Sequence, residues 1–217
     1  MNHQEQRGST ALKQCRSGLA ALQNGLIFPA VKQLREALES LQKELESRNA
    51  PLSSHPDVMP IAFSPALVAN EKRASPNNDF CFCLRGFDVA TDECTDKDLV
   101  ASVLMYNFAF AMHIHGLNTG NSRHLQRALA IYRKTKTLVD AKHQDMRYAH
   151  LALALWTNLG HISSHFLMHE GVQVCREKIR IFLWHTPRTC LAECDFVFFS
   201  GVLLTDFGRN SKNAAAA

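Results

Sequence analysis

Three histidines are spaced so that their imidazoles could share a metal ion. His161, His165 and His169 recur every four residues, which places them along one face of a helix, and imidazoles at that spacing can bind a transition metal together. The zinc-protease motifs H-E-x-x-H and H-x-x-E-H are both absent, and a helix break is expected at His169-Glu170-Gly171. We therefore predict polar or partner-facing histidines and no metal site. A metal- or thiol-dependent enzyme that uses this row and the cysteines stays open as the alternative.

The seven cysteines offer thiols, but their spacing does not match a known site. Cys81-x-Cys83 with Cys94, and Cys190-x3-Cys194, depart from the usual spacing of structural zinc ligands. The chain also lacks a phosphate-binding glycine loop, a G-x-S-x-G motif and an EF-hand loop. These patterns assign no catalytic residue and no cofactor, so we expect a protein that is not an enzyme.

Cysteine usage and the length of the apolar runs bear on the cellular compartment. An odd number of cysteines, without C-x-x-C pairs or N-x-[ST] sequons, fits a reducing compartment, the cytoplasm first and the nucleus as the alternative. The first seven residues are polar and carry no hydrophobic signal segment. The apolar runs 149–156 and 196–204 are about half of the ~20 residues that cross a membrane. We expect a cytoplasmic chain without a membrane anchor.

Positive charge gathers between residues 123 and 147. Four of these cations fall within one expected helix: Arg127, Arg133, Lys134 and Lys136. This basic face is either a solvated outer surface or a docking surface for an acidic peptide, a phosphate group or RNA. Few aromatic residues accompany it and the net charge is only +4, which disfavours a nucleic-acid partner.

Amphipathic helices in pairs are the elements that must position these side chains. Apolar residues at helical spacing predict two helices joined at Asn24-Gly25, and a capping box predicts that another helix begins near Lys97. We expect one all-α or nearly all-α domain over residues 1–213. The expected order is hairpin 10–47, Pro-rich insertion 49–94, hairpin 95–140, hairpin 147–185, capping helix 188–206 and tail 214–217.

The Pro-rich insertion breaks the helical pattern, because each proline removes a backbone donor. Two short apolar pieces within it, 58–63 and 80–87, predict a small β-ribbon. Pro60 would confine the first piece to an edge.

The third hairpin contains Trp156-x2-Leu159-Gly160. This stretch resembles the opening of the tetratricopeptide repeat, whose 34-residue unit carries W-x2-L-G-x2-Y followed by A-x3-F. The middle hairpin has Asn107-Phe108-Ala109 in place of Asn158-Leu159-Gly160, then Gly116 as the turn residue and Ala128-x3-Tyr132. The first hairpin carries the small, turn and large positions of the repeat at Gly18, Gly25, Ala30, Leu34 and Ala37. An irregular helical bundle is the alternative architecture.

The resemblance implies a groove lined by the first helix of each repeat, which would bind a peptide or a helix of a partner. Carried onto this sequence, the groove positions are Tyr106, Phe110, His113, Thr157, His161 and Ser164. They lack the Lys, Arg and Asn set with which such grooves hold a C-terminal carboxylate. The expected function is a non-enzymatic protein-binding scaffold, and a homo-oligomer stays open.

Overall fold

The computed structural model describes residues 9–47, 58–64, 67–68, 80–90, 96–142 and 144–204. Within these ranges the chain forms seven α-helices, short 3₁₀ turns and one two-stranded antiparallel sheet, so the mainly helical fold is confirmed. The residues group into two compact units, Met1–Ala69 with Arg85–Ile131 (unit one) and Asn70–Leu84 with Tyr132–Ala217 (unit two). A single domain over 1–213 stays a prediction, and each unit is described by itself.

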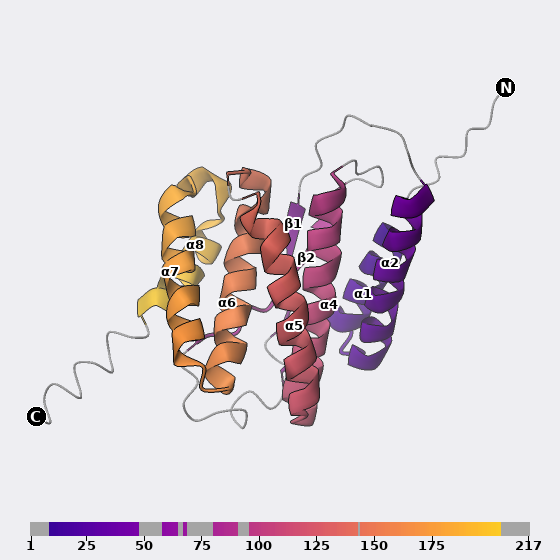
Figure 1. The fold of residues 1–217 in the computed structure, drawn as a ribbon, viewed down its shortest axis with the longest axis horizontal. Coiled ribbons are helices and arrows are strands. Elements are labelled where there is room, and N and C mark those ends of the chain that lie inside the picture. The colour runs from indigo at the N-terminus through magenta and orange to yellow at the C-terminus, as the bar shows by residue number, and fades with distance from the viewer. Residues whose placement is uncertain are drawn as a thin grey trace, which may run out of the picture. The chain divides into compact units, whose positions relative to one another are not determined.

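Unit one begins with a helical hairpin, in which α1 (Thr10–Gln23) packs against α2 (Ile27–Ser47) (Figure 1). The Ser9 hydroxyl accepts a hydrogen bond from the Leu12 N–H at 3.3 Å and so caps α1. Gly25, with φ of +74°, lies in the connection between the helices. A Cβ at Gly18 would lie 2.7 Å from Leu34 Cγ, so the glycine allows the two helices to approach closely.

The central helix of unit one is α4 (Lys97–Thr119), which begins where the capping box predicts. The Asp96 carboxylate accepts a hydrogen bond from the Leu99 N–H at 3.1 Å. Among the described helices α4 is the one long and apolar enough to cross a membrane, by length and composition only, and 78% of that stretch is buried inside the structure. A core helix surrounded by neighbours gives the same pattern.

Two predicted turns are wrong. Gly116 lies inside α4, where an added Cβ would meet Leu125 Cδ2 at 2.6 Å, and the turn is made by Gly120 with φ of +65°. The small residue serves the contact with α5 (Ser122–Asp140) rather than a change of chain direction. The break expected at His169-Glu170-Gly171 lies instead at 166–168, where Leu167 has φ of +57°.

Part of the Pro-rich insertion forms a β-ribbon, as predicted. β1 (Val58–Ala62) pairs antiparallel with β2 (Arg85–Val89), with Pro60 opposite Phe87. The second strand begins at Arg85 and not at Phe80. The Phe87 N–H and C=O both bond to the Asn107 side chain of α4, so they do not bond to Pro60 across the ribbon. The missing N–H of Pro60 therefore costs no hydrogen bond within the sheet.

Unit two contains the third predicted pair of helices. The 3₁₀ turn η2 (Met146–Tyr148) leads into α6 (Ala149–His165), which packs against α7 (His169–His185). After η3 (Arg188–Cys190), α8 (Glu193–Leu204) contacts both α7 and α6, within the range predicted for a last helix. The boundary between the units falls within α5, at Ile131.

The two tryptophans give a direct test of this core. Trp156 on α6 is 1% exposed, with the Lys136 and Lys178 ammonium groups 5.2 and 5.8 Å from its ring centroid, whereas Trp184 at the end of α7 is 86% exposed. We expect Trp156→Ala to lower the free energy of unfolding by about 3–5 kcal/mol. Trp184→Ala should change it by less than about 0.5 kcal/mol. Thermal melts of the two variants measure the difference, and equal shifts would contradict the burial of Trp156.

Candidate functional site

An asparagine in the middle of α4 hydrogen-bonds the main chain of the insertion. The Asn107 Nδ2 donates to the Phe87 carbonyl at 2.6 Å, and its Oδ1 accepts from the Phe87 N–H at 2.9 Å. Nδ2 also lies 3.3 Å from the Cys15 Sγ. The side chain is fully buried, and its oxygen and nitrogen are both used. Asn107 therefore pairs with β2 much as a neighbouring strand would.

Two further side chains of unit one bond the same edge of β2. The Tyr106 hydroxyl donates to the Arg85 carbonyl at 3.0 Å, and the Arg16 guanidinium donates to the Val89 carbonyl at 2.8 Å. The guanidinium also pairs with the Asp88 carboxylate at 2.9 Å. One edge of β2 thus bonds β1, and the other bonds side chains from two helices.

An equivalent asparagine in unit two makes the same pair of bonds. The Asn158 Oδ1, on α6, accepts from the Cys83 N–H at 2.8 Å, and its Nδ2 donates to the Cys83 carbonyl at 3.2 Å. Nδ2 also lies 3.4 Å from the Tyr132 hydroxyl, and burial raises the pKa of that phenol well above its usual value. In each unit one buried amide therefore binds the N–H and C=O of a single residue of the insertion.

Aromatic side chains of the insertion pack beside Asn158. A Cβ at Gly160 would lie 2.4 Å from the Phe80 ring, so the glycine provides the space that the ring occupies. Gly160 therefore serves the contact between α6 and the insertion. The Arg176 guanidinium lies 5.6 Å from the centroid of the Phe80 ring, within cation–π range. Phe82 lies against the His161 ring, with the centroids 5.2 Å apart.

The six predicted groove residues are all buried: Tyr106, Phe110, His113, Thr157, His161 and Ser164. Tyr106 bonds β2, and the ring centroid of Phe110 lies 5.3 Å from that of Phe63, which follows β1. His161 packs on Phe82, whereas Thr157 donates to the Leu153 carbonyl of its own helix at 2.7 Å. Three of these positions, Tyr106, Phe110 and His161, thus contact the insertion of the same chain. A role for them in binding a partner stays a prediction.

The two asparagines were not predicted as site residues, although the sequence contains a signal for them. Asn107-Phe108-Ala109 and Asn158-Leu159-Gly160 occupy matching places in two hairpins. That match served only to align the repeats. A polar residue at the same buried place twice is itself an indication of a repeated hydrogen bond, because a buried amide needs partners.

The predicted basic face lies on α5. Arg127, Arg133 and Lys134 are exposed, and Lys136 is half-buried. The Lys136 ammonium lies 3.5 Å from the Asp140 carboxylate and above the Trp156 ring, so it has a structural role. Docking of an acidic partner on the other three residues stays a prediction.

The histidine row does not lie on one helix, because His161 and His165 belong to α6 and His169 begins α7. Burial lowers the pKa of His161 from 6.5 to about 3, with a smaller contribution from the charge of His165, so the buried ring is neutral. Burial raises the pKa of Cys15 and of Cys175 to about 12, so both are thiols at neutral pH. In the part of the chain that the structure describes, no three His, Cys, Asp or Glu residues are placed to hold a metal ion.

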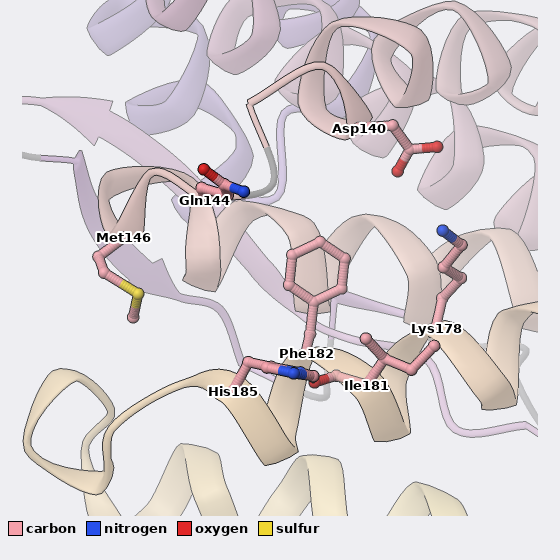
Figure 2. A pocket seen from close by; sticks show the side chains of 7 residues that line it. All are labelled: Asp140, Gln144, Met146, Lys178, Ile181, Phe182 and His185. Atoms are coloured by element: carbon pink, nitrogen blue, oxygen red, sulfur yellow. The ribbon is translucent and has the colours of Figure 1, made fainter.

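A pocket of about 570 Å³ lies in unit two beside the end of α7 (Figure 2). It is lined by the end of α5, the loop that follows and α7, through Asp140, Gln144, Met146, Lys178, Ile181, Phe182 and His185. Asp140 pairs with Lys136, and the His185 Nδ1 lies 2.8 Å from the Ile181 carbonyl oxygen. With Gln144 and Lys178 also in its lining, the pocket presents both polar and apolar side chains.

No family model matches this chain, and no curated protein or solved structure matches it either. The two buried asparagines and the segment that they bind are therefore the features from which a function can be inferred.

We expect each buried asparagine to be important for stability. Asn107→Ala or Asn158→Ala leaves a buried N–H and a buried C=O without their partners, at a cost of about 1–3 kcal/mol for each group. The control Asn24→Ala removes one exposed hydrogen bond, to the Ala20 carbonyl, and should change stability by less than about 0.5 kcal/mol. Urea unfolding curves measure the three variants. A loss at the buried sites no larger than that of the control would contradict the pairing.

Acid should destabilise unit two through His161. Its pKa is lowered to about 3 in the folded protein, so between pH 6.5 and 3 the unfolded chain binds a proton that the folded chain does not. The contribution to stability is constant above that window and falls as the pH drops through it. Unfolding of His161→Phe, followed by circular dichroism between pH 7 and 4, should depend less on pH than that of the natural protein. The control Trp184→Phe, at an exposed position that does not titrate, should retain the natural pH dependence.

Proposed function

We propose that this protein is a non-catalytic interaction module that binds an extended peptide segment through buried asparagine amides on the first helices of its hairpins. The close contact of Gly18 with Leu34 supports a tetratricopeptide-like arrangement of the first pair. The partner is a protein or peptide, and the proposed compartment is the cytoplasm.

One observation carries this proposal: Asn107 and Asn158 each bind both main-chain groups of one extended residue. A carboxamide presents one acceptor and two donor hydrogens, so it can pair with the N–H and C=O that every residue except proline carries. Such pairing is independent of the side chain that is bound. It resembles the addition of a strand to a sheet, a common way for proteins to bind peptides.

The chemistry of the surrounding side chains also favours binding over catalysis. The contacts made by Tyr106 and His161 are a hydrogen bond to a carbonyl and a ring contact, and both position an extended chain. The buried Cys15 and Cys175 have pKa values near 12, which is unsuited to a nucleophile at neutral pH. A metal- or thiol-dependent enzyme has no supporting observation among the described residues.

Selection of binders from a random peptide display library on the full-length protein tests the proposal. We expect enriched peptides that bind in extended form and whose affinity falls at least tenfold in Asn158→Ala. The control is the charge reversal Arg133→Glu with Lys134→Glu, which alters the exposed basic face and should leave the affinity unchanged. Enrichment of no peptide would contradict the function. Loss of binding only on charge reversal would move the site to α5.

A further inference from the structure

A short piece of the insertion, residues 80–84, lies on α6 as a bound peptide would lie. It has neither helical nor strand structure, yet Phe80, Phe82 and Cys83 are buried while Cys81 is exposed. Its main chain is bound by Asn158 at Cys83. The segment is thus held by side chains of the helices of unit two, as a ligand is held.

The space beneath Phe80 is built into the helix that receives it. Glycine weakens a helix, and Gly160 lies in the interior of α6. Any Cβ there would meet three atoms of the Phe80 ring at 2.4–2.7 Å. The Arg176 guanidinium above the ring adds a cation that favours an aromatic side chain over an aliphatic one. The hollow is therefore selective for an aromatic residue.

The neighbouring contacts define the next positions. Phe82, two residues along, packs on the neutral ring of His161, so a second aromatic residue fits there. Cys83 offers its N–H to the Asn158 oxygen, and proline cannot do so because it has no N–H. The side chain of the intervening Cys81 is exposed, and exposure leaves room for side chains of other sizes.

From these contacts we infer that residues 80–84 are a displaceable self-ligand, and that the partner is an extended peptide with the pattern aromatic, any residue, aromatic, non-proline. This inference rests on the proposed function, and it adds the sequence of the partner and its regulation. The self-ligand competes with the partner in the same place on α6. The apparent affinity for the partner is therefore the affinity of the open site multiplied by the fraction of molecules in which the site is open.

The probe is a fluorescein-labelled peptide with the sequence of residues 80–86, in which serine replaces both cysteines. Fluorescence anisotropy measures its binding to the full-length protein. Phe80→Ser weakens the self-ligand and should raise the affinity for the probe at least tenfold over the natural protein. The matched control Cys81→Ser changes the exposed residue of the same segment and should bind the probe as the natural protein does.

Two further reagents test the contacts themselves. A probe with proline at the position of Cys83 should not bind Phe80→Ser. Adding Asn158→Ala to Phe80→Ser should abolish the gain in affinity. Equal affinities of Phe80→Ser and Cys81→Ser for the probe, or full binding of the proline probe, would overturn the inference.

Hydrogen exchange in the natural protein provides a measurement that does not depend on the folding of a variant. The Cys83 amide should exchange through local opening, at least tenfold faster than amides in the middle of α6, because a displaceable segment leaves without unfolding the helix. Exchange of this amide only through global unfolding would also overturn the inference.

The library selection distinguishes failure of the self-ligand inference from failure of the proposed function. Selected peptides that bind the natural protein and Phe80→Ser equally would leave the function standing and remove the self-ligand. Enrichment of no peptide on either protein would remove the function.

Discussion

The polar groups of an extended main chain must find partners wherever they are buried, and this requirement organises both units. In a two-stranded ribbon, the main-chain N–H and C=O groups on only one edge of each strand form hydrogen bonds with the other strand. The second edge of β2 is bonded by Tyr106, Asn107 and Arg16, which stand on the surrounding helices. An unpaired buried N–H or C=O costs about 1–3 kcal/mol, so these three side chains are what allow β2 to lie among helices. Cys83, in a segment outside the sheet, is bonded by Asn158 in the same way.

This requirement explains residues that weaken the helices that carry them. Asparagine and glycine both have low helix propensity, yet Asn107, Asn158 and Gly160 lie in helix interiors. Each asparagine satisfies two main-chain groups of the insertion, and the glycine leaves space for an aromatic ring. The helices are therefore shaped for the extended chain that they bind as well as for one another.

Much of the helical framework could be predicted, because its signals are local. Apolar spacing located the first hairpin, and the capping-box pattern over residues 95–98 located the start of α4. The turns were harder to place, since Gly116 and Gly120 are equally suited to a turn by residue type. The choice between them is made by a contact of Gly116 with Leu125, which only the folded chain contains. The return of the insertion over the predicted groove residues was likewise not predictable, because Asn158 and Cys83 meet across 75 positions of sequence.

The place of Pro60 has a consequence for the behaviour of the protein in solution. The edge of β1 that does not face β2 presents the main chain of Pro60 at its centre, and the residue is exposed there. An exposed strand edge normally invites pairing with another molecule, which is how many proteins aggregate. Because Pro60 can offer no N–H, a second chain that approached this edge would lose a hydrogen bond in the middle of its ladder. The proline that interrupts the helical pattern of the sequence thus also protects the ribbon from aggregation.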